Sequence, residues 1–504
     1  MNINQYIKKA YLSGLVIFIS LLILKLIFGI SEKSFPIDFD YLFSPDLFFK
    51  CLLWLSLSYI FYQIGAQCKK TLNLHNVSTG IVVFISMTFL INIILAIFDV
   101  SSVFNETLLM YLTLIILLVL NFWQIQSSRK QRLLYSLSIF SCFIILAILP
   151  ESTFIGDPTI DIIDVKGFWY PMTKTYFEHG LSGAMTTSTN PGYGLYTHHV
   201  WTLLKRLTML NQLSLPSYHY MSNLLFFLAV LFIYEIRTSR ITSIFLLLFF
   251  SLYILLQGWV SFLLVNSLMG EGVTSLFFAI IVNELLQQKS KFNAMALSEI
   301  NRNFIFFWIT AGILFITKPF VSHMVFLLPF IMFSNSWIKD YKKTAILFPS
   351  FFFLSFGVIS WHVVVSHLQH VDKVTGYQVT LSSLQLEALI PVFQHWFSDK
   401  LTMGFMVVWS IGIIIGFNKK NSEHILISVC LILINLLLVL WLYATLWADY
   451  SDKDSAFRYF LETYYLMFIA LGRALDGIFA NIGYAFWPIK KVNIFPSTHD
   501  PSVH

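Results

Sequence analysis

Residues 424–448 read HILISVCLILINLLLVLWLYATLWA and contain no Asp, Glu, Lys or Arg. A helix of about 20 mainly apolar residues crosses the hydrocarbon core of a bilayer, so this stretch predicts a transmembrane helix. Similar apolar stretches recur along the chain without the alternation that outer-membrane strands show. The sequence therefore predicts an all-α fold, a polytopic bundle of about 14 transmembrane helices. The expected helices lie at 10–30, 47–66, 79–98, 107–126, 133–150, 220–236, 242–257, 272–288, 303–317, 319–334, 344–366, 401–417, 424–448 and 457–478.

The composition of the whole chain agrees with this interpretation. Of its 504 residues, 57% are hydrophobic and only 12% are charged, whereas soluble domains carry roughly 25% charged residues. A string of soluble domains, a coiled coil, a disulfide scaffold and a disordered chain are therefore excluded. The four cysteines lie in or beside apolar stretches, as small hydrophobic residues do.

Lys and Arg determine the expected orientation. They cluster in alternate connections, for example at Lys69–Lys70, Arg129–Arg132 and Lys339–Lys343. Because cytoplasmic loops are enriched in Lys and Arg, we expect both termini in the cytoplasm. Two long loops, 151–219 and 367–400, then lie on the outer face, where we expect them to contain short interfacial helices. Long loops that are not linkers usually carry function, so the site is expected on the outer face.

The first outer loop carries acids followed by aromatic residues. Asp157, Asp161 and Asp164 are spaced i, i+4 and i+7, which places them on one face if the stretch is helical. Because burial or a neighbouring carboxylate raises the pKa of an acid, such a cluster can hold a general base. A solvated acidic face with a helix cap is the alternative. Trp169 and Tyr170 follow at once, and aromatic residues of this kind require burial or an interface.

The sequence pattern for a metal site, and the pattern at the end of this loop, are less specific than the acidic cluster. Three carboxylates can hold a hard divalent cation, but no EF-hand, HExxH or paired CxxC pattern occurs. His198 and His199 are neighbours, and neighbouring side chains point apart on regular structure. We assign no metal site and treat a divalent cation as an optional participant. Residues 199–214 predict an amphipathic helix at the outer interface, since they are too short and too basic to span.

Charged residues also stand at the expected outer ends of helices. Lys318 precedes a proline inside an apolar stretch, and it either snorkels to the interface or binds phosphate. Arg458 and Tyr459 open the last helix, where the arginine matches phosphate geometry or pairs with Glu462. Glu271 lies between two glycines, which favours close approach of backbone or ligand.

This constellation resembles the GT-C superfamily of membrane glycosyltransferases, which take a sugar from a polyprenyl-phosphate carrier. The residues that carry the resemblance are Asp161, Asp164, Trp169-Tyr170-Pro171, Glu271, Lys318-Pro319 and Arg458-Tyr459. The resemblance implies a base at Asp161 or Asp164 and phosphate binding by Lys318 and Arg458. It further implies substrate contacts by Asp157, Trp169, Tyr170, Lys174, Glu271 and Tyr459. On this basis 1–131 form N-terminal helices, 132–478 the GT-C-like module, and 479–504 a cytoplasmic tail.

Two other functions stay open. An O-antigen polymerase or ligase, acting on pyrophosphate-linked oligosaccharides, also has two large outer loops and would use residues 367–400. A transporter or flippase of a lipid-linked sugar would instead place charges at the membrane midplane. The resemblance implies a bacterial plasma membrane, with a polyprenyl-phosphate sugar, a glycan or lipid acceptor and membrane lipids as partners. Nucleic acid is not an expected partner, because the cytoplasmic charges are explained by topology.

Overall fold

The computed structural model describes residues 45–124, 133, 135–142, 169–187, 195–207, 218–236, 238–256, 270–292, 297–314, 324–333, 347–369, 385–398, 400–417, 422–445 and 460–486. Within these ranges every regular element is helical and no strand occurs, which confirms the all-α class. The expected helix at 10–30 and both termini lie outside the described residues.

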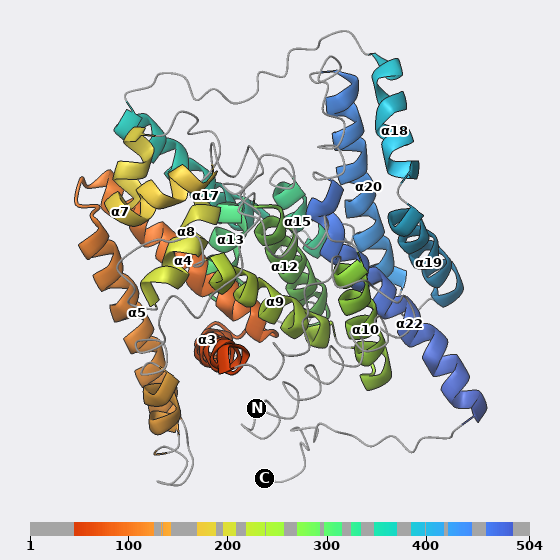
Figure 1. The fold of residues 1–504 in the computed structure, drawn as a ribbon, viewed down its shortest axis with the longest axis horizontal. Coiled ribbons are helices and arrows are strands. Elements are labelled where there is room, and N and C mark those ends of the chain that lie inside the picture. Colours follow the sequence, from red (N-terminus) through yellow and green to blue (C-terminus); the bar gives the residue numbers. More distant parts are fainter. Residues whose placement is uncertain are drawn as a thin grey trace.

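Most of the expected helices that fall within these ranges occur close to their expected bounds, as Figure 1 shows. They are α3 (Pro45–Thr71), α4 (Val77–Ile97), α5 (Val103–Gln124), α9 (Tyr218–Glu235), α10 (Arg240–Leu256), α12 (Glu271–Phe292), α13 (Leu297–Leu314), α15 (Leu328–Phe333), α17 (Leu347–Gln369), α19 (Lys400–Gly416), α20 (Ser422–Ala444) and α22 (Tyr464–Phe486). Short 3-10 turns, η5 (Val325–Leu327) and η7 (Leu461–Thr463), precede α15 and α22.

The described parts of the two long loops are helical as well. The first contains α7 (Tyr170–Thr187) and α8 (Tyr196–Leu207). In the second, α18 (Leu389–Ser398) follows the 3-10 turn η6 (Leu386–Ala388). One expectation for this region is wrong in part: the polar residues of α8 do not form an exposed face, because Thr197, His198 and Arg206 are buried against other helices.

Three described helices are long and apolar enough to cross a membrane: Val77–Ile97, Val103–Trp123 and Ser422–Ala444. The second of them, in α5, is largely uncovered by the rest of the protein. Its exposed residues include Phe104, Ile115 and Trp123. Large apolar side chains on the outside of a bundle fit contact with lipid rather than with water.

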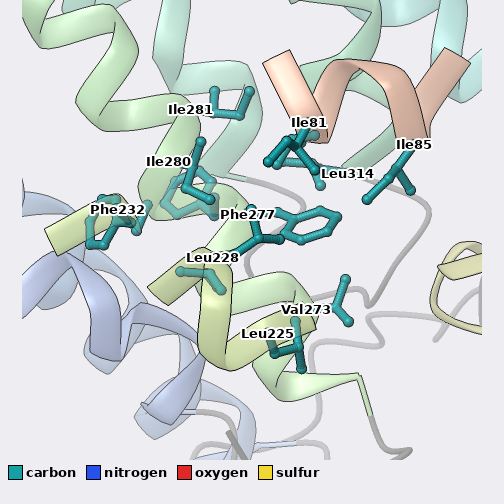
Figure 2. Close-up of a cluster of buried hydrophobic side chains, with 14 of the residues drawn as sticks. Ile81, Ile85, Leu225, Leu228, Phe232, Val273, Phe277, Ile280, Ile281 and Leu314 are labelled. Carbon is teal, nitrogen blue, oxygen red and sulfur yellow. The ribbon is translucent and has the colours of Figure 1, made fainter. Parts of the chain in front are cut away.

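The core lies around α12, as the close-up in Figure 2 shows. Phe277, Ile280 and Ile281 of α12 are fully buried. They pack in one buried cluster with α4, α9 and α13, through Ile81, Ile85, Leu225, Leu228, Phe232 and Leu314. Glycines allow two of the closest crossings: a Cβ at Gly80 would overlap the carbonyl oxygen of Gly65, and one at Gly312 that of Leu354. Small residues at such crossings are typical of membrane helix packing.

Two carboxylates, Glu284 near the far end of α12 and Glu235 at the end of α9, hold the first turn of α4. The Glu284 carboxylate accepts hydrogen bonds from the backbone N–H groups of His75 (2.6 Å) and Asn76 (3.0 Å). Glu235 accepts those of Val77 (2.6 Å) and Ser78 (3.1 Å). These are N–H groups that a helix start leaves without an intrahelical partner. Along the axis of α12, this end is about 20 Å from Glu271.

Candidate functional site

Trp169 joins the start of α7 to the start of α8. Its side chain is only 4% exposed. Its indole ring stacks on the imidazole of His198, with centroids 5.2 Å apart and an interplanar angle of 26°. Tyr170, the first residue of α7, is half-buried and packs against the core. Two of the predicted substrate contacts therefore lie beside a histidine that was not among the predicted site residues.

We assign the tautomer of His198 from the hydrogen bonds around it. Thr173 Oγ1 donates its single proton to the carbonyl oxygen of Trp169 at 2.9 Å. The same oxygen lies 2.6 Å from His198 Nδ1, and with its own proton on the carbonyl it accepts a proton from that nitrogen. Nε2 then carries the lone pair, and it has no hydrogen-bond partner within the described part of the chain. Burial lowers the pKa of His198 to about 3, so the ring is neutral at pH 7.

His199 is equally buried but fully satisfied. Thr88 Oγ1 donates to the Ile85 carbonyl, so it accepts from His199 Nε2 at 2.9 Å. Nδ1 then accepts from the Tyr176 hydroxyl at 3.2 Å. The two histidines bond to different residues, as expected for neighbours on a helix, and we assign them opposite tautomers. His199 joins α8 to α4 and α7, whereas His198 leaves one nitrogen open.

The start of α12 meets the start of α8. Gly270 adopts a positive φ of 87° just before the helix, and a Cβ there would lie 3.0 Å from Thr197 Oγ1. Glu271 follows and is fully buried. A turn and a half further along α12, the ring of Phe277 contacts that of Tyr196, with centroids 6.2 Å apart. The residue before the predicted Glu271 therefore lies against Thr197.

The 3-10 turn η7 lies on another side of the same helix start. The backbone N–H of Tyr465 donates to Ser275 Oγ at 3.4 Å. Glu271 and Glu462 stand about one turn before these two residues, and both are fully buried. We call this group, formed by Trp169, His198, Thr197, Glu271 and Glu462, the Glu271 cluster. The start of α8 contacts Trp169 through His198 and contacts Gly270 through Thr197, and α22 contacts α12 near its start.

A buried ion pair fixes α8 in place. Glu106, in the first turn of α5, accepts a hydrogen bond from Arg206 Nη1 at 2.9 Å, with both side chains buried. It also accepts the backbone N–H of Leu181 at 2.7 Å. This second contact requires Gly180, whose φ is 74° and whose Cβ would lie 2.9 Å from Glu106 Oε1. Arg206 also lies over the ring of Tyr176, 5.8 Å from its centroid.

The predicted site residues thus divide into three groups. Trp169, Tyr170 and Glu271 lie in or beside the Glu271 cluster. Lys174 lies on the outside of α7, with its Nζ 3.9 Å from Glu178 and its side chain half exposed. The remaining calls fall outside the described residues: Asp157, Asp161, Asp164, Lys318, Arg458 and Tyr459.

Sequence reasoning missed Thr173, Thr197 and Glu106. Each is an ordinary polar residue in the sequence, and its role depends on a partner on another helix. No group of three or more His, Cys, Asp or Glu that could hold a metal ion occurs among the described residues. No protein-family model, curated protein or solved structure matches this chain.

Proposed function

We propose that this protein is an integral membrane glycosyltransferase of the GT-C type. It transfers a sugar from a polyprenyl-phosphate carrier to a glycan or lipid acceptor at the outer face of a bacterial plasma membrane. The observation that carries the proposal is the Glu271 cluster. Trp169 and Glu271 come from distant segments, and the sequence predicts both as substrate contacts. Trp169 stacks on His198, and the neighbouring Thr197 lies against Gly270, the residue before Glu271. The starts of α8 and α12 thus lie together at one end of an apolar bundle, where a lipid-borne donor can arrive from the bilayer.

The proposed reaction is a single displacement. Asp161 or Asp164 accepts the proton of the acceptor hydroxyl as its oxygen attacks the anomeric carbon. The bond between this carbon and the phosphate oxygen breaks, the anomeric configuration inverts, and the carrier leaves as a phosphate. Lys318 and Arg458 stabilise the charge on that phosphate. A divalent cation is not required for these steps.

The Glu271 cluster supplies binding rather than proton transfer in this proposal. Trp169 and Tyr170 offer apolar surface with polar edges, which suits a sugar ring. Asp157, Tyr459 and Glu271 offer groups that hydrogen-bond to sugar hydroxyls. Lys174, being half exposed, is suited to the part of the acceptor that extends into water.

The test uses purified full-length protein in lipid nanodiscs with native membrane lipids and a crude acceptor glycan. The carrier that is released is identified by mass spectrometry. We expect polyprenyl monophosphate from the wild type, and none from the Asp161→Asn or Asp164→Asn variant that removes the base. Glu387→Gln is the matched control, since Glu387 is an exposed carboxylate in the second loop.

Each other outcome overturns a stated part of the proposal. Release of polyprenyl pyrophosphate would favour the polymerase or ligase and direct attention to residues 367–400. Absence of carrier release from the wild type would favour the transporter. Full activity in both aspartate variants would remove the first loop as the source of the base.

A further inference from the structure

Nε2 of His198 is a buried ring nitrogen that the proposed reaction does not use. Both nitrogens of the neighbouring His199 are satisfied by Thr88 and Tyr176. Both nitrogens of a buried imidazole are thus hydrogen-bonded at His199. At His198, by contrast, Nε2 has no partner in the described residues. A buried acceptor without a partner is rare in folded proteins, which suggests that a ligand completes it.

Two threonine hydroxyls at the starts of α8 and α12, Thr197 Oγ1 and Thr274 Oγ1, are also buried without a partner in the described residues. Thr274 lies on the face of α12 that carries Gly270 and Phe277, and these two residues contact Thr197 and Tyr196. Within the described part of the chain, the hydroxyl groups of Thr197 and Thr274 are therefore free to bond to a ligand where the starts of α8 and α12 pack together.

The tautomer of His198 selects the chemistry of the ligand. Because Nδ1 donates to Thr173, Nε2 presents only a lone pair. A phosphate oxygen also presents lone pairs and is not attracted to it, and burial opposes the protonation that would change this. A hydroxyl group, by contrast, donates a proton to Nε2. The complementary ligand is therefore a polyhydroxyl group and not an anion.

We infer that His198 forms a subsite that binds a sugar hydroxyl of the substrate, with Nε2 as the hydrogen-bond acceptor. This inference rests on the proposed function for the identity of the sugar carrier. His198 is a specificity-determining residue and takes no part in proton transfer. Trp169 fixes the plane of its ring by stacking, and Thr173 fixes its tautomer.

Two substitutions of His198 test the contributions of its two ring nitrogens separately. The amide of His198→Asn can reach the position of Nδ1 and keeps a group for Thr173, but it leaves nothing at Nε2. The longer side chain of His198→Gln places its amide near Nε2 and restores an acceptor there. We expect the asparagine variant to bind sugar carriers about tenfold more weakly, as for the loss of about 1.4 kcal/mol. The glutamine variant should recover most of this affinity.

Binding is measured with purified full-length protein in nanodiscs by the change in tryptophan fluorescence. The probes are a panel of short polyprenyl-phosphate sugars, their monodeoxy analogues, and the same polyprenyl phosphate without sugar. The sugar-free carrier should bind all variants equally. One monodeoxy analogue, which lacks the recognised hydroxyl, should bind the wild type as weakly as the full sugar carrier binds His198→Asn. The same analogue should bind His198→Asn no more weakly than it binds the wild type.

Thr173 provides a second, independent test if His198→Asn does not fold. Thr173→Val removes the acceptor for Nδ1 and should weaken sugar binding, whereas Thr173→Ser keeps the hydroxyl and should not. Equal loss of the sugar-free carrier, no loss of any sugar carrier, or no sugar binding by the wild type would overturn the subsite. Sugar binding without carrier release would overturn the proposed transfer and leave the subsite standing. Carrier release together with unchanged sugar binding in His198→Asn would overturn the subsite and leave the proposed transfer standing.

Discussion

Replacing Arg206 by methionine tests whether the buried ion pair holds α8 in place. Arg206 Nη1 lies 2.9 Å from Glu106 Oε2, and the two side chains are 5% and 0% exposed. Without the guanidinium, the carboxylate stays buried with only neutral donors, the Leu181 N–H and the Ser101 hydroxyl. Removing one partner of a buried pair costs about 3–5 kcal/mol, because the other charge is left uncompensated. We expect Arg206→Met to lower the free energy of unfolding by this amount.

The double variant distinguishes this explanation from a simple loss of packing. Glu106→Gln alone leaves the arginine buried without a counter-charge and should cost about as much as Arg206→Met. With both changes no buried charge remains, so the loss should fall to about 1–2 kcal/mol, well below the sum of the single losses. The matched control is Lys174→Met, since that lysine forms a half-exposed pair with Glu178 at 3.9 Å. Exposed pairs contribute about 0–1 kcal/mol.

The assay is equilibrium unfolding of the purified protein in detergent micelles, followed by tryptophan fluorescence over a denaturant titration. The reasoning would be refuted if Arg206→Met were as mild as Lys174→Met. It would also be refuted if the single losses simply added in the double variant, because additivity means that the two residues do not interact.

The same assay tests two further features. Gly80→Ala should lower the free energy of unfolding by about 1–3 kcal/mol, because its Cβ would overlap the backbone of Gly65. Gly404→Ala is the control, since Gly404 has open space around it, and this variant should be neutral or slightly stabilising. Equal effects at the two glycines would contradict the close crossing. Burial lowers the pKa values of His198 and His199 to about 3, below the usual value of about 6.5, so from pH 6.5 down to pH 3 the unfolded chain binds more protons than the folded one. Stability should therefore be full above about pH 6.5 and fall on acidification, by about 1.4 kcal/mol per pH unit for each histidine. Substituting both by glutamine should flatten the stability profile around pH 5, and an unchanged slope would show that the two rings are not held neutral.

The helices were predictable because their signal is local. A long run of apolar residues needs no partner to be recognised, so 424–448 and 79–98 correspond closely to α20 and α4. The helix α18 agrees with the short interfacial helices expected in the loop 367–400, but its bounds were not predicted, since only ten residues form it. Within the first loop, the aromatic residues at Trp169 and Tyr170 predicted burial correctly, but not the helix against which they pack.

The site was predictable only in part. Glu271 was selected because of its flanking glycines, and Gly270 indeed makes a close approach, to Thr197. His198 and His199 were recognised as a pair that points apart, yet nothing in the sequence distinguishes the one that is satisfied from the one that is open. Each ring bonds to a threonine of another helix, Thr88 or Thr173, but among the described residues only His199 also meets a tyrosine hydroxyl, that of Tyr176.

By itself, the sequence determined that this protein is built of apolar helices, because the length and composition of each segment decide whether it can cross a bilayer. Tertiary structure alone decided which polar residues are buried and what each one faces. Arg206 looked like part of a basic, exposed helix face until Glu106, 100 positions away, was found beside it. The reason is physical: the cost of burying a polar group depends on its partners, and those partners come from segments that only the packed fold brings together.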